Sequence, residues 1–119
     1  MGATVLIVDD HPVCRQAAQA LLEDEGYEVV AAEACGRDAL AAVDRLRPGI
    51  VVLDVGLPDI DGIEVARRLA AEGGANAPAV VLTSSRALSD LRATPEECGA
   101  VGVIPKDQLS GTAIAALAA

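Results

Sequence analysis

The stretch VVLDVGLPDIDG, residues 51–62, decides the fold, because an apolar run ends there in the carboxylate of Asp54 and a turn rich in Gly and Pro follows. A single Asp at such a place means little, since Asp often begins a turn after a strand. Three other apolar runs also end in polar residues: VLIVDDHP in Asp9 and Asp10, VVLTSS in Thr83, and VGVIPK in Lys106. Four runs with such ends indicate that these polar residues belong to one site.

Apolar runs alternate with segments of helical spacing along the chain. Runs rich in β-branched residues predict strands at 4–8, 28–32, 50–53, 79–82 and 101–104. Apolar residues three or four positions apart predict helices at 12–25, at 37–47, from Asp61 or Gly62 to just before Gly73, and at 108–118. The alternation predicts an α/β fold in which right-handed crossovers place helices on both faces of a parallel sheet.

Local features of the helices refine this prediction. In the first helix one face is shared by Val13, Ala17, Ala20 and Leu21. Asp61 is expected to cap the third helix, whereas Asp59 is expected to be an ordinary turn residue. Pro95 forbids one continuous helix through residues 86–98, and Thr94 before it is expected to cap a short new turn.

The composition bounds both the size and the partners of the protein. A chain of 119 residues makes one domain, and with 52% hydrophobic but 1% aromatic residues its core must consist of Val, Leu, Ile and Ala. Nine basic and 18 acidic residues give a net charge of −9. This balance argues against binding of nucleic acid or an anionic membrane by this chain alone, and it favours cations or a basic protein surface.

The cysteines and the N-terminus indicate a cellular compartment. Cys14, Cys35 and Cys98 are odd in number and widely spaced, so we expect buried free thiols rather than a disulfide framework or a zinc site. The N-terminal residues show no signal-peptide pattern, and no apolar run approaches the ~20 residues that span a bilayer. We therefore expect a cytoplasmic protein that does not enter a membrane.

The strand ends predict a site of defined chemistry. In a parallel sheet ligands bind at the carboxyl ends of the strands, where the polar residues of the four runs meet. Converging carboxylates repel one another unless a cation neutralises them, and an all-oxygen ligand set favours Mg²⁺. Asp54 could then act as a nucleophile for a phosphoryl group, with Lys106 and the Thr83 hydroxyl binding its oxygens.

The segments VLIVDDHP, LDVGLPDIDG, VVLTSS and GAVGVIPKD closely resemble the receiver domain of two-component response regulators, across essentially the whole chain. The resemblance implies a flavodoxin-like (CheY-like) doubly wound sheet of order 2-1-3-4-5. It implies that Asp54 accepts a phosphoryl group from a sensor histidine kinase. It also implies the remaining roles: Asp10 as a direct Mg²⁺ ligand, Asp9 as a ligand through water, the Gly56 backbone carbonyl as a third protein ligand, Thr83 as the switch hydroxyl, and Lys106 as the phosphate-binding lysine.

The same resemblance bears on the output. The DDHP form and the pair Lys106-Asp107 are most similar to the NarL/LuxR-type subfamily, whose members carry a helix-turn-helix domain. We expect residues 1–119 to form a receiver domain without an effector domain, so that DNA would be bound only through a domain absent from this chain. A stand-alone receiver that acts through protein contacts, and a self-dimer, remain open. Val103 occupies the position at which the family usually has an aromatic residue that couples to the switch hydroxyl.

Two other functions fit this sequence less well than the receiver does. A phosphatase of the haloacid-dehalogenase type also uses an Asp nucleophile and Mg²⁺, but it needs a second Asp where this chain has Gly56. A flavin carrier on the same fold needs aromatic residues, which are lacking. We therefore expect a phosphoacceptor module and not an enzyme. His11 has no His or Cys partner in sequence and is expected to be a loop residue at the rim of the site.

Overall fold

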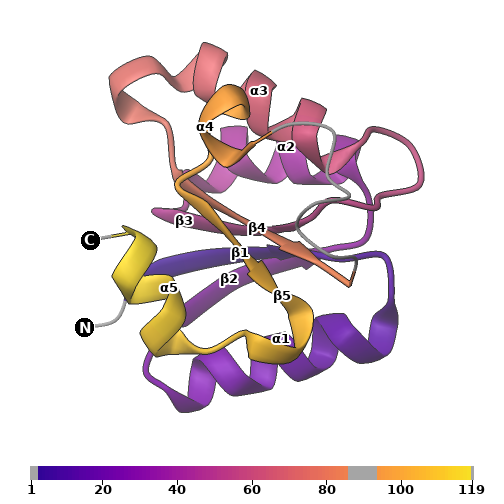
Figure 1. Ribbon diagram of the computed structural model, residues 1–119, viewed down its shortest axis with the longest axis vertical. Helices are drawn as coiled ribbons and strands as arrows, with labels where there is room; N and C mark the ends of the chain where they lie inside the picture. The colour runs from indigo at the N-terminus through magenta and orange to yellow at the C-terminus, as the bar shows by residue number, and fades with distance from the viewer. Residues whose placement is uncertain (1–2, 86–93, 119) are drawn as a thin grey trace.

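The computed structural model describes residues 3–85 and 94–118, which form a five-stranded parallel sheet between two layers of helices (Figure 1). The sheet has the order β2-β1-β3-β4-β5. Its strands are β1 (Thr4–Val8), β2 (Glu28–Glu33), β3 (Ile50–Asp54), β4 (Ala79–Ser84) and β5 (Gly102–Pro105). The predicted α/β class and the strand order 2-1-3-4-5 are both confirmed.

Helices cover both faces of the sheet, as predicted. One layer contains α2 (Gly36–Leu46), α3 (Gly62–Gly73) and α4 (Pro95–Cys98), and the other contains α1 (Pro12–Asp24) and α5 (Gly111–Ala118) (Figure 1). Two short 3-10 turns, η1 (Gly74–Asn76) and η3 (Lys106–Gln108), follow α3 and β5. Each face of the sheet contributes alternate strand residues to its own apolar cluster.

The central strands are buried on both faces, which is why their sequence is almost continuously apolar. In β1 the side chains of Val5, Leu6, Ile7 and Val8 are at most 1% exposed. Leu6 and Val8 pack in the cluster beneath α2 and α3, whereas Val5 and Ile7 pack in the cluster beneath α1 and α5. Neighbouring strands end together, because Val8 pairs with Leu53 and Asp54 pairs with Thr83.

The prediction of which residues of α1 face the core is wrong. Val13 is 79% exposed and Ala17 is also exposed, while Leu22 is fully buried and Ala18 packs in the same cluster. The guanidinium of Arg15 donates a hydrogen bond to the Asp9 carbonyl at 2.8 Å, which directs that side of the helix toward the end of β1. Since Arg15, Ala18 and Leu22 are spaced three and four apart, they share the inward face and Val13 turns outward.

The C-terminal helix begins later than predicted. Residues Lys106–Gln108 form η3, and α5 begins only at Gly111. Ser110 stops the helix from extending further back, because its hydroxyl accepts a hydrogen bond from the Ala113 N–H at 3.0 Å in the manner of an N-cap. Tyr27 donates its hydroxyl proton to the Gly111 carbonyl at 3.0 Å and ties this start to the α1–β2 turn.

Other local predictions have mixed outcomes. Asp61 caps α3 by accepting from the Ile63 N–H at 2.7 Å, and Thr94 caps α4 by accepting from Glu97 N–H at 3.3 Å, as predicted. Of the segment expected to be irregular, residues 86–93 lie outside the described residues. The cysteines are free, but only Cys98 is buried, and Cys14 is exposed.

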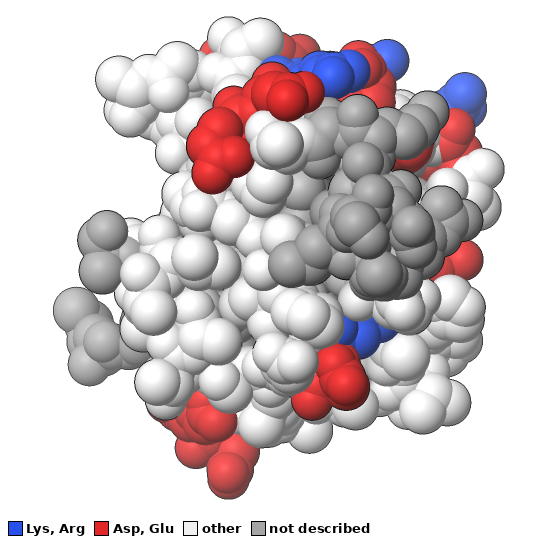
Figure 2. All heavy atoms as spheres, viewed as in Figure 1, with Lys and Arg blue, Asp and Glu red and all other residues white. Residues whose placement is uncertain are grey.

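The charge pattern of the described surface agrees with the acidic composition. On the face drawn in Figure 2, acidic side chains gather over α4, and the surface over α5 is uncharged. Helix α5 consists of Gly, Thr, Ala, Ile and Leu, so its outer side offers no charge to a partner. Among residues 3–85 and 94–118, no helix is both long and apolar enough to cross a bilayer.

Candidate functional site

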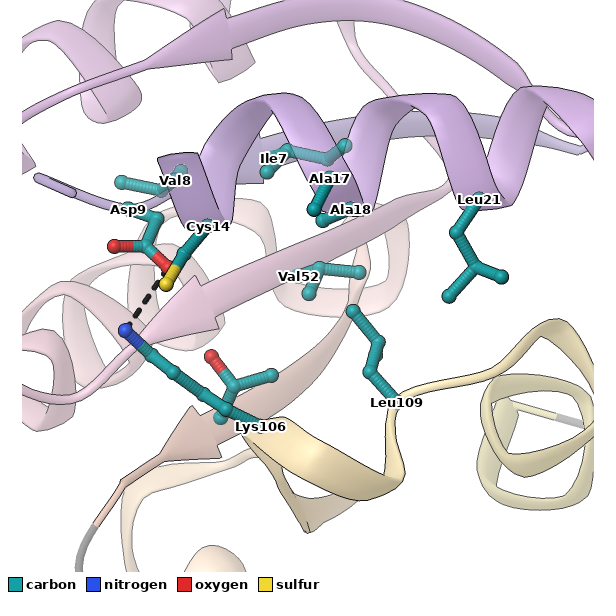
Figure 3. Close-up of a pocket in the computed structure, with 11 residues that line it drawn as sticks. Ile7, Val8, Asp9, Cys14, Ala17, Ala18, Leu21, Val52, Lys106 and Leu109 are labelled. Carbon is teal, nitrogen blue, oxygen red and sulfur yellow. Dashed lines mark ion pairs between the residues drawn. The ribbon is translucent and has the colours of Figure 1, made fainter. Parts of the chain in front are cut away.

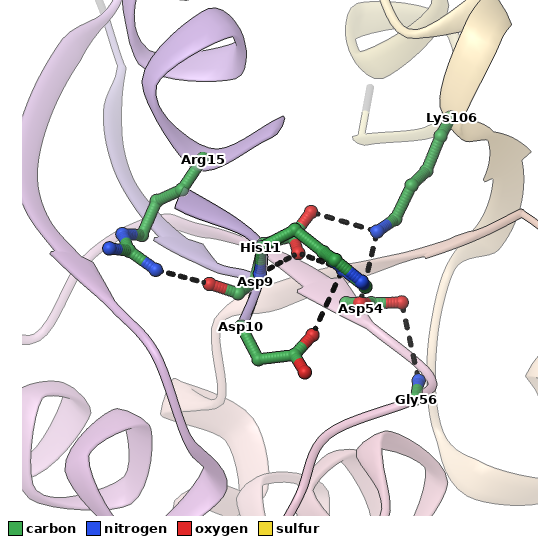
Figure 4. A network of polar contacts seen from close by, with 7 residues as sticks. All are labelled: Asp9, Asp10, His11, Arg15, Asp54, Gly56 and Lys106. Atoms are coloured by element: carbon green, nitrogen blue, oxygen red, sulfur yellow. Dashed lines mark hydrogen bonds and ion pairs between the residues drawn. The ribbon is translucent and has the colours of Figure 1, made fainter. Parts of the chain in front are cut away.

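A lysine joins two carboxylates at the carboxyl edge of the sheet. Lys106 Nζ lies 3.0 Å from Asp9 Oδ2 and 3.1 Å from Asp54 Oδ2 (Figure 4). Burial of the ammonium opposes its charge, but hydrogen bonds and attraction from Asp9 and Asp54 outweigh that cost. The pKa of Lys106 is therefore raised above its ordinary value. The ammonium stays positive at neutral pH and is positioned to receive a further anion.

Both carboxylates that Lys106 binds are buried. Asp9 is 7% exposed and Asp54 is 4% exposed. Although it ends its strand, Asp54 is therefore covered rather than exposed. Asp54 is the last residue of β3, and the Lys106 side chain reaches over it from η3 while the following loop folds back beside it. Sequence alone could not show this cover, because Lys106 is 52 residues away.

The loop after β3 is held by short-range contacts. The Gly56 N–H donates to Asp54 Oδ1 at 3.2 Å, and Gly62 N–H donates to the Val55 carbonyl at 2.9 Å. A side chain at Gly62 would collide with the Asp54 carbonyl, which explains why glycine stands where α3 begins. These contacts keep the backbone of Gly56 beside the Asp54 carboxylate.

Asp59 ties this loop to helix α2, a role that the sequence did not suggest. Its carboxylate accepts from the backbone N–H groups of Gly36 at 2.8 Å and Arg37 at 3.0 Å. Chiefly because of the bond from Arg37, the pKa of Asp59 is held well below its usual range. Asp59 therefore caps α2 from a distance of 22 residues in sequence, and local patterns give no signal for such a cap.

A second pair of groups lies beside the first two carboxylates. Asp10 Oδ1 is buried and has no hydrogen-bond partner among the described residues. His11 Nδ1 lies 3.2 Å from this oxygen and 3.4 Å from Asp9 Oδ1 (Figure 4). One potential ligand atom from each of Asp9, Asp10, His11 and Asp54 lies within 4.8 Å of the other three. An orphaned buried oxygen in an oxygen-rich cluster fits a bound cation.

The charges of the site support the same conclusion. Three carboxylates and the single ammonium of Lys106 leave two negative charges uncompensated. One divalent cation would balance them. Gly56 lies in the adjoining loop and is exposed, and its N–H donates to Asp54 Oδ1, so its backbone lies beside the cluster.

A hydroxyl and a small cavity complete the site. Thr83 is 4% exposed and neighbours Asp54 in the sheet register. Thr83 lines a cavity of about 180 Å³ together with Asp9 and Lys106, and its other lining residues are mostly apolar side chains of β1, α1 and Leu109 (Figure 3). Val103 is half-buried on β5 and packs toward the opposite helical layer.

The arrangement can do phosphoryl chemistry at a carboxylate. Asp54 offers an oxygen nucleophile, Lys106 offers a fixed positive charge, and Thr83 offers a hydroxyl donor near by. The structure brings together the predicted residues Asp9, Asp10, Asp54 and Lys106, with Thr83 beside them. Val103 alone lies apart from this group.

Comparison with known proteins gives a consistent result. A family model described as the response regulator receiver domain matches residues 5–118. In sequence the chain is 39% identical over 106 residues to a protein-glutamate methylesterase/protein-glutamine glutaminase of Hahella chejuensis, covering 87% of this chain and 30% of that protein. It is 48% identical over 69 residues to BvgA of Bordetella pertussis, named as a positive transcription regulator of virulence factors, covering 58% and 33%.

A solved structure agrees over nearly the full chain. A two-component response regulator of the LuxR family from Aurantimonas sp. superposes with a TM-score of 0.86 and 31% identity, covering 99% of this chain and 86% of that one. The chain spans about a third of the length of the two curated relatives. What is shared is thus one unit of longer proteins.

Proposed function

The chain belongs to the response regulator receiver domain family of two-component systems, and from this premise we propose that Asp54 accepts a phosphoryl group from a sensor histidine kinase. The observation that carries the proposal is the Lys106 ammonium, which bridges the buried carboxylates of Asp9 and Asp54 at 3.0 and 3.1 Å. Such a cation beside a carboxylate nucleophile is what a transferring phosphoryl group requires. Receipt of phosphate from a sensor kinase also supports the cytoplasmic location expected from the sequence.

In the proposed reaction an Asp54 oxygen attacks the phosphorus of a phosphohistidine. The new O–P bond forms as the P–N bond breaks, and the electron pair stays on the leaving imidazole nitrogen, which takes up a proton from water. Lys106 exchanges one carboxylate partner for a phosphoryl oxygen, so its charge remains compensated throughout. The Thr83 hydroxyl donates to another phosphoryl oxygen.

A divalent cation fits the same pocket. Asp9, Asp10 and Asp54 would hold Mg²⁺ together with the Gly56 carbonyl, and the ion would neutralise negative charge on the phosphoryl oxygens. Support comes from the orphaned Asp10 Oδ1 and from the two uncompensated negative charges of the cluster. The chain's own residues bind and orient the group, while the buried position of Asp54 limits access of water.

For the whole protein we propose that phosphorylation controls transcription through a DNA-binding domain. The LuxR-family structure and the relative named as a transcription regulator support this output. The stand-alone receiver acting through protein contacts remains the alternative. The two differ in whether the reading frame encodes a helix-turn-helix domain next to these residues.

Intact-mass measurement tests the phosphoacceptor. Tag-free protein incubated with acetyl phosphate and Mg²⁺ should gain the mass of one phosphoryl group, and Asp54→Asn should gain none. Asp44→Asn serves as the matched control, because Asp44 is an exposed carboxylate of α2 away from the strand ends. If Asp54→Asn is labelled as completely as the parent, the proposal is wrong.

A further inference from the structure

We infer that His11 is a side-chain metal ligand of this site, so that the site binds first-row transition ions such as Co²⁺ through an imidazole nitrogen as well as carboxylates. The inference rests on the proposed function only in that the same carboxylates hold the cation. It assigns a role to a residue that the phosphoryl chemistry does not use.

The His11 imidazole lies beside two carboxylates of the cluster. His11 is the residue before α1, and its N–H donates to Asp9 Oδ1 at 2.9 Å. The ring nitrogen Nδ1 lies 3.4 Å from Asp9 Oδ1 and 3.2 Å from Asp10 Oδ1. Two neighbouring ligands that each lie 2.0–2.1 Å from one octahedral ion are about 3 Å apart. The nitrogen thus stands at a ligand-to-ligand distance from two carboxylates.

The contact between His11 and Asp10 does not satisfy the carboxylate. Although Nδ1 is 3.2 Å from Asp10 Oδ1, this oxygen is buried and makes no hydrogen bond within the described residues. A buried acceptor without a donor is costly, and a cation shared by the oxygen and the nitrogen removes that cost. A divalent ion would also balance the two uncompensated negative charges of the cluster.

The nitrogen changes which ions the site prefers. Carboxylate and carbonyl oxygens suit Mg²⁺, whereas imidazole suits Co²⁺, Ni²⁺ and Zn²⁺, and affinity for nitrogen ligands rises along the first transition row. Oxygen ligands alone therefore account for Mg²⁺ binding, and His11 adds affinity selectively for transition ions. The ring is 65% exposed, so replacing it removes little packing.

Calorimetric titration of tag-free protein with Mg²⁺ and with Co²⁺ measures this selectivity. His11→Gln should bind Co²⁺ at least about tenfold more weakly than the parent, and its Mg²⁺ affinity should change by less than about twofold. Gln16→Ala is the matched control, because Gln16 is an exposed residue of the same helix and does not line the cavity of the site. This control should bind Co²⁺ as the parent does.

Pulsed electron paramagnetic resonance of the Mn²⁺-loaded protein identifies the ligand directly. His11 is the only histidine of the chain, so ¹⁴N coupling of imidazole type in the parent that is lost in His11→Gln assigns the nitrogen without ambiguity. An equal fall in Mg²⁺ and Co²⁺ affinity, or no fall in either, would overturn the inference. So would tighter binding of both ions by His11→Gln, since the ring would then be an imidazolium that competes with the metal.

The two proposals can fail separately. Labelling of parent Asp54 by acetyl phosphate with Mg²⁺ tests the phosphoacceptor and does not depend on the ligand role of His11. Absence of ¹⁴N coupling in a protein that is phosphorylated on Asp54 would reject the metal inference alone.

Discussion

The Lys106 ammonium lies 3.1 Å from Asp54 Oδ2, so the end of the edge strand β5 supplies the positive charge for the carboxylate at the end of the central strand β3. The same nitrogen is 3.0 Å from Asp9 Oδ2. One side chain therefore compensates two buried acids from two further strands. The stability of this edge and its proposed chemistry depend on the same cation.

Replacing Lys106 should destabilise the metal-free protein more than the metal-bound protein. Lys106→Met leaves Asp9 and Asp54 buried without their cation, which should lower the free energy of unfolding by about 1–3 kcal/mol, a figure reduced because the ammonium is partly open to solvent. Excess Mg²⁺ should shrink this loss. Urea unfolding with and without Mg²⁺ measures it, and Lys106→Arg, which keeps the charge, should lose less. Equal losses in both conditions would count against a shared acidic pocket.

Replacing Asp10 and replacing Asp9 should have opposite effects on the stability of the protein, although the two residues are neighbours in sequence. Asp10 carries the orphaned oxygen, so Asp10→Asn should raise the free energy of unfolding of the metal-free protein by about 1 kcal/mol. Asp9→Asn should lower it, because Asp9 accepts from His11 N–H and pairs with Lys106.

Mg²⁺ should remove the stability advantage that Asp10→Asn has over the parent in the metal-free protein. Mg²⁺ stabilises the form that binds it in proportion to the logarithm of its concentration over the dissociation constant. Thermal unfolding over a Mg²⁺ series should show a rising melting temperature for the parent and a much smaller rise for Asp10→Asn. A rise of the same size in both proteins would show that Asp10 is no ligand.

Much of this site could be predicted from sequence because its residues follow apolar strands. The period and composition of the runs predict parallel strands, the ends of such strands meet at one edge, and Asp9, Asp54, Thr83 and Lys106 follow from that alone. The family resemblance drawn from the same segments is also confirmed. Their roles in phosphoryl transfer remain predictions.

The features that the sequence did not predict have two causes. Some depend on contacts between distant segments, and others on a small difference in apolar character between the faces of one helix. Asp59 caps α2 across the β3–α3 loop, a contact that leaves no local pattern. The strand ends predict that Lys106 lies near Asp54, but not that the lysine side chain covers the carboxylate. In α1 the many alanines make one face little more apolar than another, so the polar contact of Arg15 decides the orientation and Val13 is left exposed.

Asp59 should stabilise the protein at neutral pH and lose this effect in acid. Its pKa in the folded protein is lowered from the ordinary 3.8 of the unfolded chain, so its contribution is complete above about pH 3.8 and is lost as the pH falls further. Asp59→Asn should lower the melting temperature at pH 7, and the difference from the parent should close as the pH falls below 3.8. Scanning calorimetry from pH 7 downward measures this. A difference that stays constant across that range would mean that the carboxylate charge plays no part in the cap.

Gly56, in the loop after β3, and Gly62, at the end of that loop, should differ in how much an added methyl group destabilises the protein. A Cβ at Gly62 would meet the Asp54 carbonyl oxygen and would come within 2.8 Å of Val55 Cα. Both obstacles are backbone atoms, so the loop or α3 must move, at a cost of about 1–3 kcal/mol of unfolding free energy. A Cβ at Gly56 meets nothing within 4 Å, and Gly56→Ala should therefore unfold at the same urea concentration as the parent, within error.

The displaced loop should also disturb the carboxylate it follows. Gly62 N–H holds the Val55 carbonyl at 2.9 Å, and Val55 separates Asp54 from Gly56, whose N–H donates to Asp54 Oδ1. Gly62→Ala should thus slow labelling of Asp54 by acetyl phosphate even at low temperature, where the variant remains folded. Far-ultraviolet circular dichroism under the labelling conditions verifies the folded state. If Gly62→Ala matches the parent in both unfolding and labelling, the close approach of α3 to the Asp54 backbone does not constrain the site.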